Sequence, residues 1–92
     1  MRGYEVLREG RAVERHLFLP DAAVERRTWH LRLGKACYYV SWISLNPEGT
    51  GPECMAFRCD GDGEVADWSA AAVSYAPNSN EAFAEVTDQL LA

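Results

Sequence analysis

The clearest alternation of apolar and polar positions lies in residues 28–33. Trp29, Leu31 and Leu33 would point to one side of an extended chain, and polar residues occupy the positions between them. Successive side chains of a strand point to opposite faces, so this pattern predicts a half-buried β-strand.

The next segment, Ala36 to Leu45, is apolar on both faces and rich in aromatic and β-branched residues, which predicts a central strand. Gly34-Lys35 before it predicts a two-residue turn. The composition of residues 46–52 predicts a loop, and Glu53 to Cys59 predicts a returning strand.

At the start of the chain, Tyr4–Arg8 and Arg11–Leu19 predict two strands joined by a tight turn at Glu9-Gly10. Pro20 would end the second strand because it has no N–H to donate. Asp21 could then cap a short helical turn, or the segment could be a loop.

The second half of the chain begins with a predicted turn at residues 60–63. Residues 64–76 leave two possibilities open, either extended pieces at 64–66 and 72–75 or a helical turn at 70–72. After Pro77, Asn78 is a candidate helix cap with Glu81 three residues later. An apolar stripe then predicts a helix to the end of the chain, formed by Phe83, Val86, Leu90 and Leu91.

These elements predict one α+β domain over residues 1–92. It would contain a small, mostly antiparallel β-sheet of four to six strands, with a C-terminal α-helix packed on one face. The chain of 92 residues is 48% hydrophobic and holds ten aromatic residues, which is enough for a single core.

The sequence predicts a cytoplasmic protein. It has no apolar stretch of the roughly 18 residues that a membrane span requires, and its first residues lack the apolar segment of a signal peptide. The odd number of cysteines fits a reducing compartment. Lysine and isoleucine occur once each, a bias that indicates a GC-rich bacterium or one of its phages.

Charge divides unequally along the chain, whose formal net charge is −5. Residues 1–35 hold eight basic and five acidic side chains, a balance of +3, whereas residues 36–92 hold one basic and nine acidic side chains, a balance of −8. The asymmetry indicates either an interaction face or two elements of opposite sign lying side by side.

The residues suited to metal binding and catalysis do not form a known motif, so we expect no cofactor and no catalytic site. Cys54 and Cys59 are separated by four residues, but on a strand they would point to opposite faces. Cys37 has no cysteine near it in sequence, and we expect Cys37 and Cys54 to be buried core residues. A zinc site completed by His16 or His30, or a small hydrolase, ranks third, below a protein-binding module and a self-associating accessory protein.

Three other functional classes are disfavoured by spacing and charge. The run Asp60-Gly61-Asp62-Gly63-Glu64 is similar to the start of an EF-hand calcium loop. Such a loop needs a glutamate at position 12, and counted from Asp60 this position is Ala71. Gly49-Thr50-Gly51 is too short for a phosphate loop. The arginines of the first third are interleaved with glutamates and the pI is about 4.9, which argues against direct nucleic-acid binding.

The acidic half suggests a negative surface that binds a host or phage protein with a basic surface. Trp29 and Trp42 lie in predicted strands and are expected in the core, whereas Trp68 follows a turn and is the best candidate for an exposed contact anchor. The predicted partner-binding residues are Asp60, Asp62, Glu64, Asp67, Trp68, Glu81, Glu85 and Asp88.

The segments Val40–Leu45 and Glu53–Phe57 carry a resemblance. They resemble a strand pair, Val-Ser-Thr-Val-Phe-Leu and Glu-Thr-Met-Val-Phe, of small proteins from actinobacteria and their phages that have no known function. The sequence departs from that pattern at Trp42, Ser44, Cys54 and Ala56. The resemblance implies a two-strand unit and a phage or prophage setting.

The sequence thus favours a non-enzymatic protein-binding module without a membrane partner. Its most concrete form is a phage- or prophage-encoded inhibitor of a host nucleic-acid-handling complex, of the anti-CRISPR type, that acts through the acidic surface. The alternative is a self-associating accessory protein that dimerises through a sheet edge or the helix.

Overall fold

The computed structural model describes residues 3–15, 23–44 and 52–92. In these residues five strands and one helix follow one another along the chain. They are β1 (Glu5–Arg15), β2 (Ala23–Leu33), β3 (Ala36–Ile43), β4 (Cys54–Cys59), β5 (Ala72–Ser74) and α1 (Ser79–Leu91).

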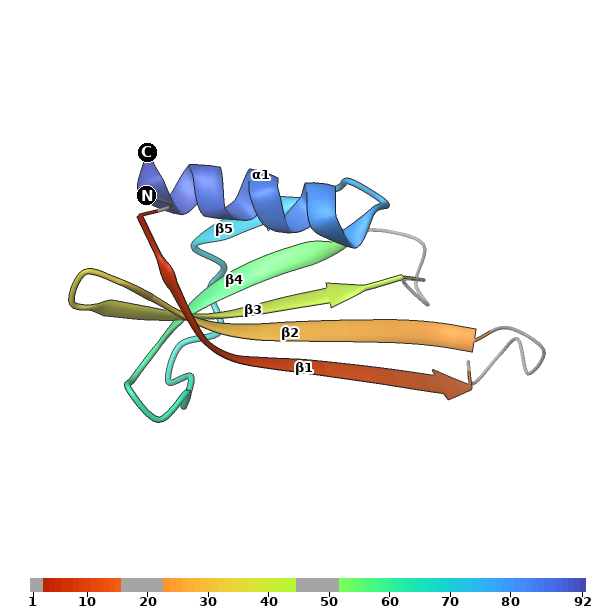
Figure 1. The fold of residues 1–92 in the computed structure, drawn as a ribbon, viewed down its shortest axis with the longest axis horizontal. Coiled ribbons are helices and arrows are strands. Elements are labelled where there is room, and N and C mark those ends of the chain that lie inside the picture. Colours follow the sequence, from red (N-terminus) through yellow and green to blue (C-terminus); the bar gives the residue numbers. More distant parts are fainter. Residues whose placement is uncertain (1–2, 16–22, 45–51) are drawn as a thin grey trace.

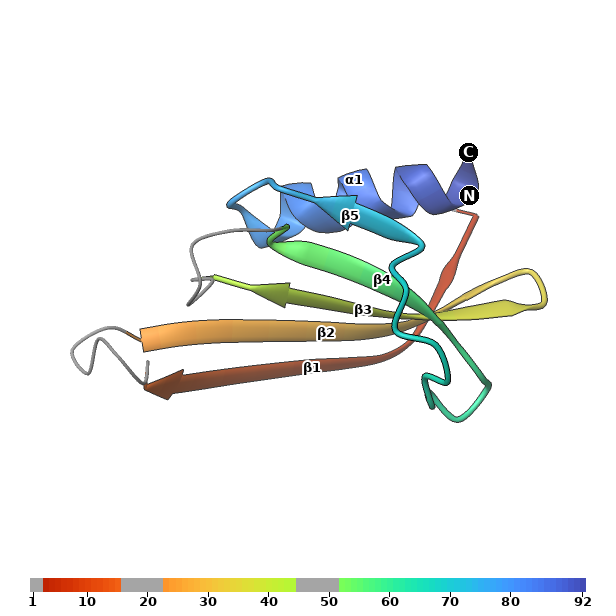
Figure 2. The same cartoon turned by 180° about the vertical axis from the view of Figure 1, so that it is seen from behind.

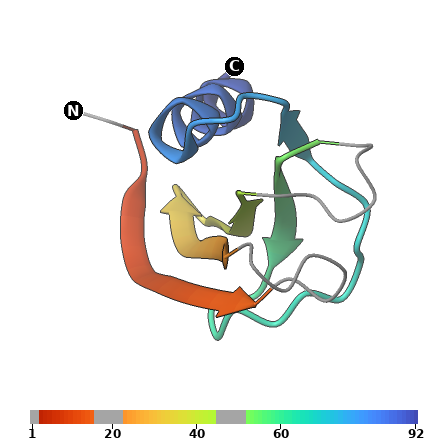
Figure 3. The ribbon, with the colours of Figure 1, turned by 90° about the vertical axis from the view of Figure 1, so that its right-hand side faces the viewer.

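The five strands form one sheet in the order β1-β2-β3-β4-β5, and every neighbouring pair is antiparallel. The helix α1 lies along one face of this sheet (Figure 1, Figure 2). Viewed end-on, the sheet curves, so that the start of β1 and the strand β5 lie on either side of α1 (Figure 3). The fold class predicted from the sequence, α+β with a C-terminal helix on one face, is confirmed.

The centre of the sheet agrees with the sequence. β2 and β3 are joined by the predicted turn at Gly34-Lys35, where Leu33 pairs with Ala36 and Gly34 has a φ of 62°. This left-handed conformation favours glycine. β3 is the third of five strands, as its two apolar faces predict, and it pairs with β4 along residues 37–42.

The predicted turn at Glu9-Gly10 is wrong, because both residues lie inside β1 and pair with β2. Gly10 lies opposite Thr28, and a Cβ on Gly10 would come within 2.6 Å of Thr28 Oγ1. The glycine therefore leaves room for the Thr28 side chain and does not reverse the chain. The register between β1 and β2 shifts earlier, at a bulge between Val6 and Arg8.

The hydrophobic core lies between the sheet and α1. Fully buried residues from β2, β3 and β4 meet Ala82 and Val86 of the helix, and each large apolar side chain so buried stabilises the fold by about 1.5–3 kcal/mol. We call this side of the sheet the helix face. Its buried strand residues are Trp29, Leu31, Val40, Trp42, Cys54, Ala56 and Ala72.

The helix begins where the sequence predicts. The Asn78 side chain accepts hydrogen bonds from the N–H groups of Asn80 at 2.9 Å and Glu81 at 3.1 Å, which satisfies two N–H groups of the first turn. Of the predicted apolar stripe, Val86 is buried, Phe83 and Leu90 pack against the core, and Leu91 is exposed.

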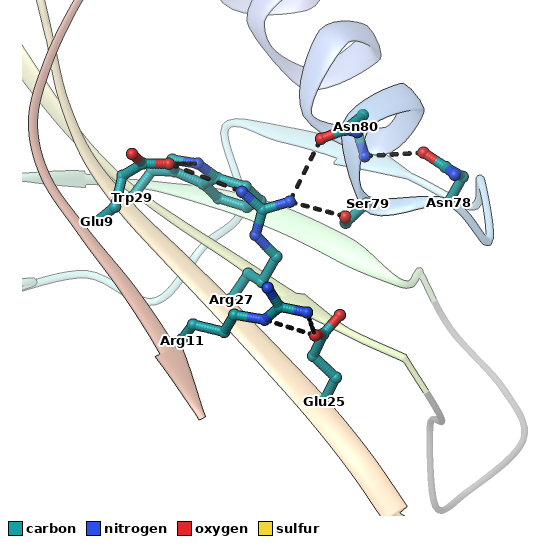
Figure 4. A network of polar contacts seen from close by, with 8 residues as sticks. All are labelled: Glu9, Arg11, Glu25, Arg27, Trp29, Asn78, Ser79 and Asn80. Carbon is teal, nitrogen blue, oxygen red and sulfur yellow. Dashed lines mark hydrogen bonds and ion pairs between the residues drawn. The ribbon is translucent and has the colours of Figure 1, made fainter. Parts of the chain in front are cut away.

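Arg27 of β2 connects the sheet to the first turn of α1 (Figure 4). Its Nη1 donates to Ser79 Oγ at 2.9 Å and to Asn80 Oδ1 at 3.3 Å. The same guanidinium lies over the Trp29 ring, 4.9 Å from its centre, and that ring stacks on Phe83 at 4.5 Å with an interplanar angle of 4°. These contacts fix the position of the helix on the sheet.

The sequence left the structure of residues 64–76 open, and the last part of this stretch forms a β-strand. Residues 63–70 have no regular structure, and β5 covers Ala72–Ser74. The predictions for residues 16–22 and 45–51, which include the end of a strand at Pro20, the cap at Asp21 and the loop from Asn46, lie outside the described residues. In the described part of the chain no helix is long and apolar enough to cross a membrane.

Candidate functional site

The side of the sheet opposite α1 carries a second, aromatic surface. Side chains alternate along β3 and β4, so Tyr39 and Phe57 point away from Val40 and Ala56 of the helix face. The connection of residues 60–71 between β4 and β5 runs below this side of the sheet in Figure 1. It brings Trp68 edge-on against Phe57, at 4.9 Å between ring centres, and against Tyr39, at 6.3 Å.

Trp68 is held by these rings but remains open to solvent. It is 65% exposed, whereas Trp29 and Trp42 are 2% and 4% exposed. The predicted division between two core tryptophans and one exposed tryptophan is therefore confirmed. A large ring held in one orientation loses little side-chain entropy when a partner covers it, which suits it to anchor an interface.

The residues before Trp68 form an acidic turn, which we define as residues 60–67. The carboxylate of Asp60 accepts hydrogen bonds from the N–H groups of Asp62 at 2.8 Å and Glu64 at 3.0 Å. The N–H of Gly63 donates to Asp60 O at 3.1 Å, as expected for the predicted turn at 60–63. Asp60 therefore shapes the turn, while the side chains of Asp62 and Glu64 are exposed.

Asp67 closes the acidic turn in a similar way. Hydrogen bonds from the side chain and from the N–H of Ser69 lower the pKa of the Asp67 carboxyl below its ordinary value. Asp67 is consequently ionised at neutral pH. No lysine, arginine or histidine follows Arg58 in the chain, so no cation from this segment balances the carboxylates of the turn.

Two hollows adjoin the acidic turn. One of about 550 Å³ lies between the end of β4 and the turn and is lined by Arg58, Cys59, Asp60, Glu64, Val65, Ala66 and Asp67. A smaller one of about 120 Å³ reaches the sheet surface beside Gly63 and is lined by Arg8, Thr28, Trp29, His30, Tyr39, Asp62 and Gly63. The surface is thus uneven, with carboxylates at its rim.

The structure brings only some of the predicted partner-binding residues together. Asp60, Asp62, Glu64, Asp67 and Trp68 belong to one short segment on the side of the sheet opposite α1. The other three lie on α1, where the Glu85 carboxylate accepts a hydrogen bond from Ser74 Oγ at 3.3 Å. The eight residues therefore form two acidic groups and not one surface, the second group being Glu81, Glu85 and Asp88.

Four of the eight basic side chains in residues 1–35 form ion pairs with glutamates between β1 and β2. Four ion pairs join these strands, at 2.7 Å for Arg32–Glu5, 3.5 Å for Arg26–Glu14 and 3.7 Å for Arg27–Glu9, together with Arg11–Glu25. All involve exposed or half-exposed side chains, so each stabilises the fold by about 0–1 kcal/mol. The pairs cancel charge locally, and residues 1–35 keep a balance of +3 against −8 for residues 36–92.

The three cysteines are buried and free. Cys54 faces the helix, and burial raises the pKa of its thiol to about 12. Cys37 lies opposite Cys59 across β3 and β4, a pairing that no pattern in the sequence indicates. Burial, followed by the nearby Cys37 and Asp60, also raises the pKa of Cys59. The thiols of Cys54 and Cys59 stay protonated at neutral pH and are poor nucleophiles and metal ligands.

No group of three or more potential metal ligands occurs among the described residues. Cys54 and Cys59 point to opposite faces of β4, as their spacing predicts, while His16 lies outside the described residues. What the described part of the site offers is a fixed aromatic ring beside exposed carboxylates, which is suited to binding.

Comparison of the chain with protein-family models, curated proteins and solved structures finds no match. The resemblance of residues 40–45 and 53–57 to small actinobacterial and phage proteins stays a prediction. In the structure, residues 37–42 of β3 pair with residues 54–59 of β4.

Proposed function

We propose that this chain is a non-enzymatic protein-binding module that binds a basic surface of another protein through Trp68 and the acidic turn. The observation that carries the proposal is the state of Trp68, which is 65% exposed and yet held edge-on by Phe57 and Tyr39. Exposed tryptophans in a fixed orientation are typical centres of protein interfaces.

The charges around Trp68 favour a basic partner. The acidic turn holds Asp60, Asp62, Glu64 and Asp67 and no basic residue. Complementary charge speeds association and excludes acidic partners, and its effect weakens as salt screens it. Binding at this site should therefore combine a salt-dependent association rate with a dissociation rate set by burial of the Trp68 ring.

In its most specific form, the proposal is an inhibitor encoded by a phage or prophage that occupies a nucleic-acid site on a host nucleoprotein complex. Two features support it. The carboxylates present negative charge as a phosphate backbone does, and the residue usage indicates a high-GC bacterial host. A site built for phosphates is lined by lysine and arginine, to which the acidic turn is complementary.

The experiment that tests this proposal is affinity capture from lysate of a high-GC bacterium, with and without nuclease. We expect one basic, nucleic-acid-handling protein to be retained after nuclease treatment and released by high salt. A matched pair of variants locates the site, because Tyr75 is 67% exposed and lies outside the acidic turn. Trp68→Ala should lose the partner and Tyr75→Ala should keep it.

Two double variants with the same change in net charge test which of the two acidic groups binds the partner. Asp62→Asn with Glu64→Gln removes carboxylates from the acidic turn, and Glu81→Gln with Asp88→Asn removes them from α1. We expect only the first pair to weaken capture. Retention of the partner by Trp68→Ala, or equal loss with both pairs, would contradict binding at the acidic turn.

A further inference from the structure

The two edges of the sheet differ in how their backbone groups are occupied. At the β5 edge, Gln89 Nε2 donates to Val73 O at 2.6 Å and Val73 N donates to Gln89 Oε1 at 3.1 Å. At the other edge, β1 is 11 residues long and pairs only with β2 in the described part of the chain. An edge strand of this length presents a row of backbone groups to which another strand can pair.

The hydrogen-bond pattern shows which residues of β1 direct their backbone groups outward. Ser44 N donates to Glu25 O at 2.8 Å, so the backbone groups of Glu25 face β3. These groups alternate along an antiparallel strand, so those of Arg26 face β1, where Ala12 lies opposite. The N–H and C=O groups that face away from the sheet therefore belong to Glu9, Arg11, Val13 and Arg15.

We propose that the outer edge of β1 pairs with β1 of a second copy of this chain, antiparallel and with Ala12 on the two-fold axis. In this register Glu9 lies opposite Arg15 of the second copy, and Arg11 lies opposite Val13 of the second copy. All the outward N–H and C=O groups of residues 9–15 then form hydrogen bonds. The two sheets become one continuous sheet.

Charge selects this register over its neighbours. If the two-fold axis lay at Arg11, Arg11 would face Arg11 of the second copy. If it lay at Val13, Arg11 of each copy would face Arg15 of the other. Like charges directly opposite one another destabilise a strand pair, and opposite charges stabilise it. With Ala12 at the centre, the pair contains two Glu9–Arg15 contacts and no like charges face each other.

The side chains needed for this pairing are placed at the edge. Arg15 forms no ion pair among the described residues. Glu9 is fixed by a hydrogen bond from Trp29 Nε1 at 2.9 Å, as Figure 4 shows. Val13 is 65% exposed, and the aliphatic part of Arg11 of the second copy would cover it. The small side chain of Ala12 permits close approach at the axis.

The bulge between Val6 and Arg8 sets the limit of the paired segment. It ends the regular register, so a centre at Gly10 would leave only residues 8–12 in a regular ladder. Charged residues often protect an edge strand from pairing, since like charges that face each other destabilise the pair. Here glutamate and arginine are both present, at positions that match in one register.

The mass of the chain in solution tests the proposal. Light scattering over about 10 µM to about 1 mM should show a transition from 10.3 kDa towards twice that mass, as expected for a weak interface. Val13→Pro removes an outward N–H and no β1–β2 hydrogen bond, so it should keep the thermal midpoint and abolish the dimer. A wild-type chain that stays monomeric throughout would overturn the proposal.

A matched pair of charge variants tests the register. Arg15→Glu places a carboxylate opposite Glu9 of the second copy and should weaken the dimer at least tenfold. Arg8→Glu makes the same change in net charge outside residues 9–15 and should leave dimerisation unchanged; neither arginine forms an ion pair among the described residues. Equal effects of the two variants would overturn the register.

Disulfide cross-linking tests the position of the two-fold axis. Ala12→Cys should form a disulfide-linked dimer on mild oxidation, because residues at the centre of a non-hydrogen-bonded pair approach within disulfide distance. Val13→Cys should not, and cross-linking of Val13→Cys in place of Ala12→Cys would overturn the assignment. Trp68→Ala should not change these results, which makes failure of this proposal distinguishable from failure of the proposed partner binding.

Discussion

The side chain of Gln89 forms a pair of hydrogen bonds with the backbone of Val73, as a neighbouring strand would. Its amide accepts from Val73 N at 3.1 Å and donates to Val73 O at 2.6 Å. The last turns of α1 thereby close the β5 edge of the sheet. β1 is consequently the edge at which a further strand can pair.

Gln89→Ala should lower the free energy of unfolding by about 1–2 kcal/mol, because two hydrogen bonds are lost and an edge of the sheet is opened. Gln89→Glu is the matched variant. Its carboxylate can accept from Val73 N but has no N–H to donate to Val73 O, so its stability should be no better than that of Gln89→Ala. Urea unfolding measures both, and a Gln89→Glu variant as stable as wild type would contradict the role assigned to the amide.

Gly10→Ala should destabilise the fold by about 1–3 kcal/mol, since the added Cβ would lie 2.6 Å from Thr28 Oγ1 and displace the Thr28 side chain. In a Thr28→Ala background the obstacle is absent. There the same change should be neutral or stabilising, because alanine loses less backbone entropy than glycine. A double-mutant cycle in urea tests this, and additive effects would show that the Gly10–Thr28 contact is not the cause.

Stability should fall with alkaline pH in a way that depends on Cys54. Its pKa is raised from 9.0 to about 12 in the folded chain, so above pH 9 the unfolded thiol ionises while the folded thiol keeps its proton. The unfolded state then gains stability by about 1.4 kcal/mol per pH unit between about pH 9 and pH 12. Wild type should lose stability in this window more steeply than Cys54→Ala, and parallel curves from urea unfolding would refute the assignment.

Arg27→Lys should destabilise the fold by about 1–2 kcal/mol, although the charge is kept. A lysine ammonium cannot lie flat on Trp29 and also donate to Ser79 and Asn80. Arg26→Lys is the control on the same strand, because within residues 3–15, 23–44 and 52–92 Arg26 forms only an exposed ion pair at 3.5 Å with Glu14. Thermal unfolding should separate the two, and equal midpoints would mean that Arg27 acts through charge alone.

The sequence predicts those parts of the fold whose signals are local. The alternation around Trp29 and Leu31, the turn at Gly34-Lys35 and the cap at Asn78 each depend on residues close together in the chain, and each is confirmed. The turn predicted at Gly10 was wrong because glycine occurs both in turns and where a side chain of the neighbouring strand needs room. Only the position of Thr28 on the neighbouring strand distinguishes the two cases.

The candidate site could be predicted only in part. A tryptophan after a polar turn indicated exposure, and the acidic residues around it were visible in the sequence. The contacts of Trp68 with Phe57 and Tyr39 could not be predicted, since residues 63–70 form no regular element whose period would place them. The division of the acidic residues between two sides of the sheet likewise follows from topology and not from spacing.

The measurement that tests the central claim most directly is the affinity of the purified captured partner for wild type, Trp68→Ala and Tyr75→Ala. The two variants remove aromatic rings of similar exposure, 65% and 67%. We predict that Trp68→Ala weakens binding about 30-fold or more, as truncation of a central interface tryptophan does, and that Tyr75→Ala leaves it unchanged. Unchanged affinity of a folded Trp68→Ala variant would contradict the proposed function.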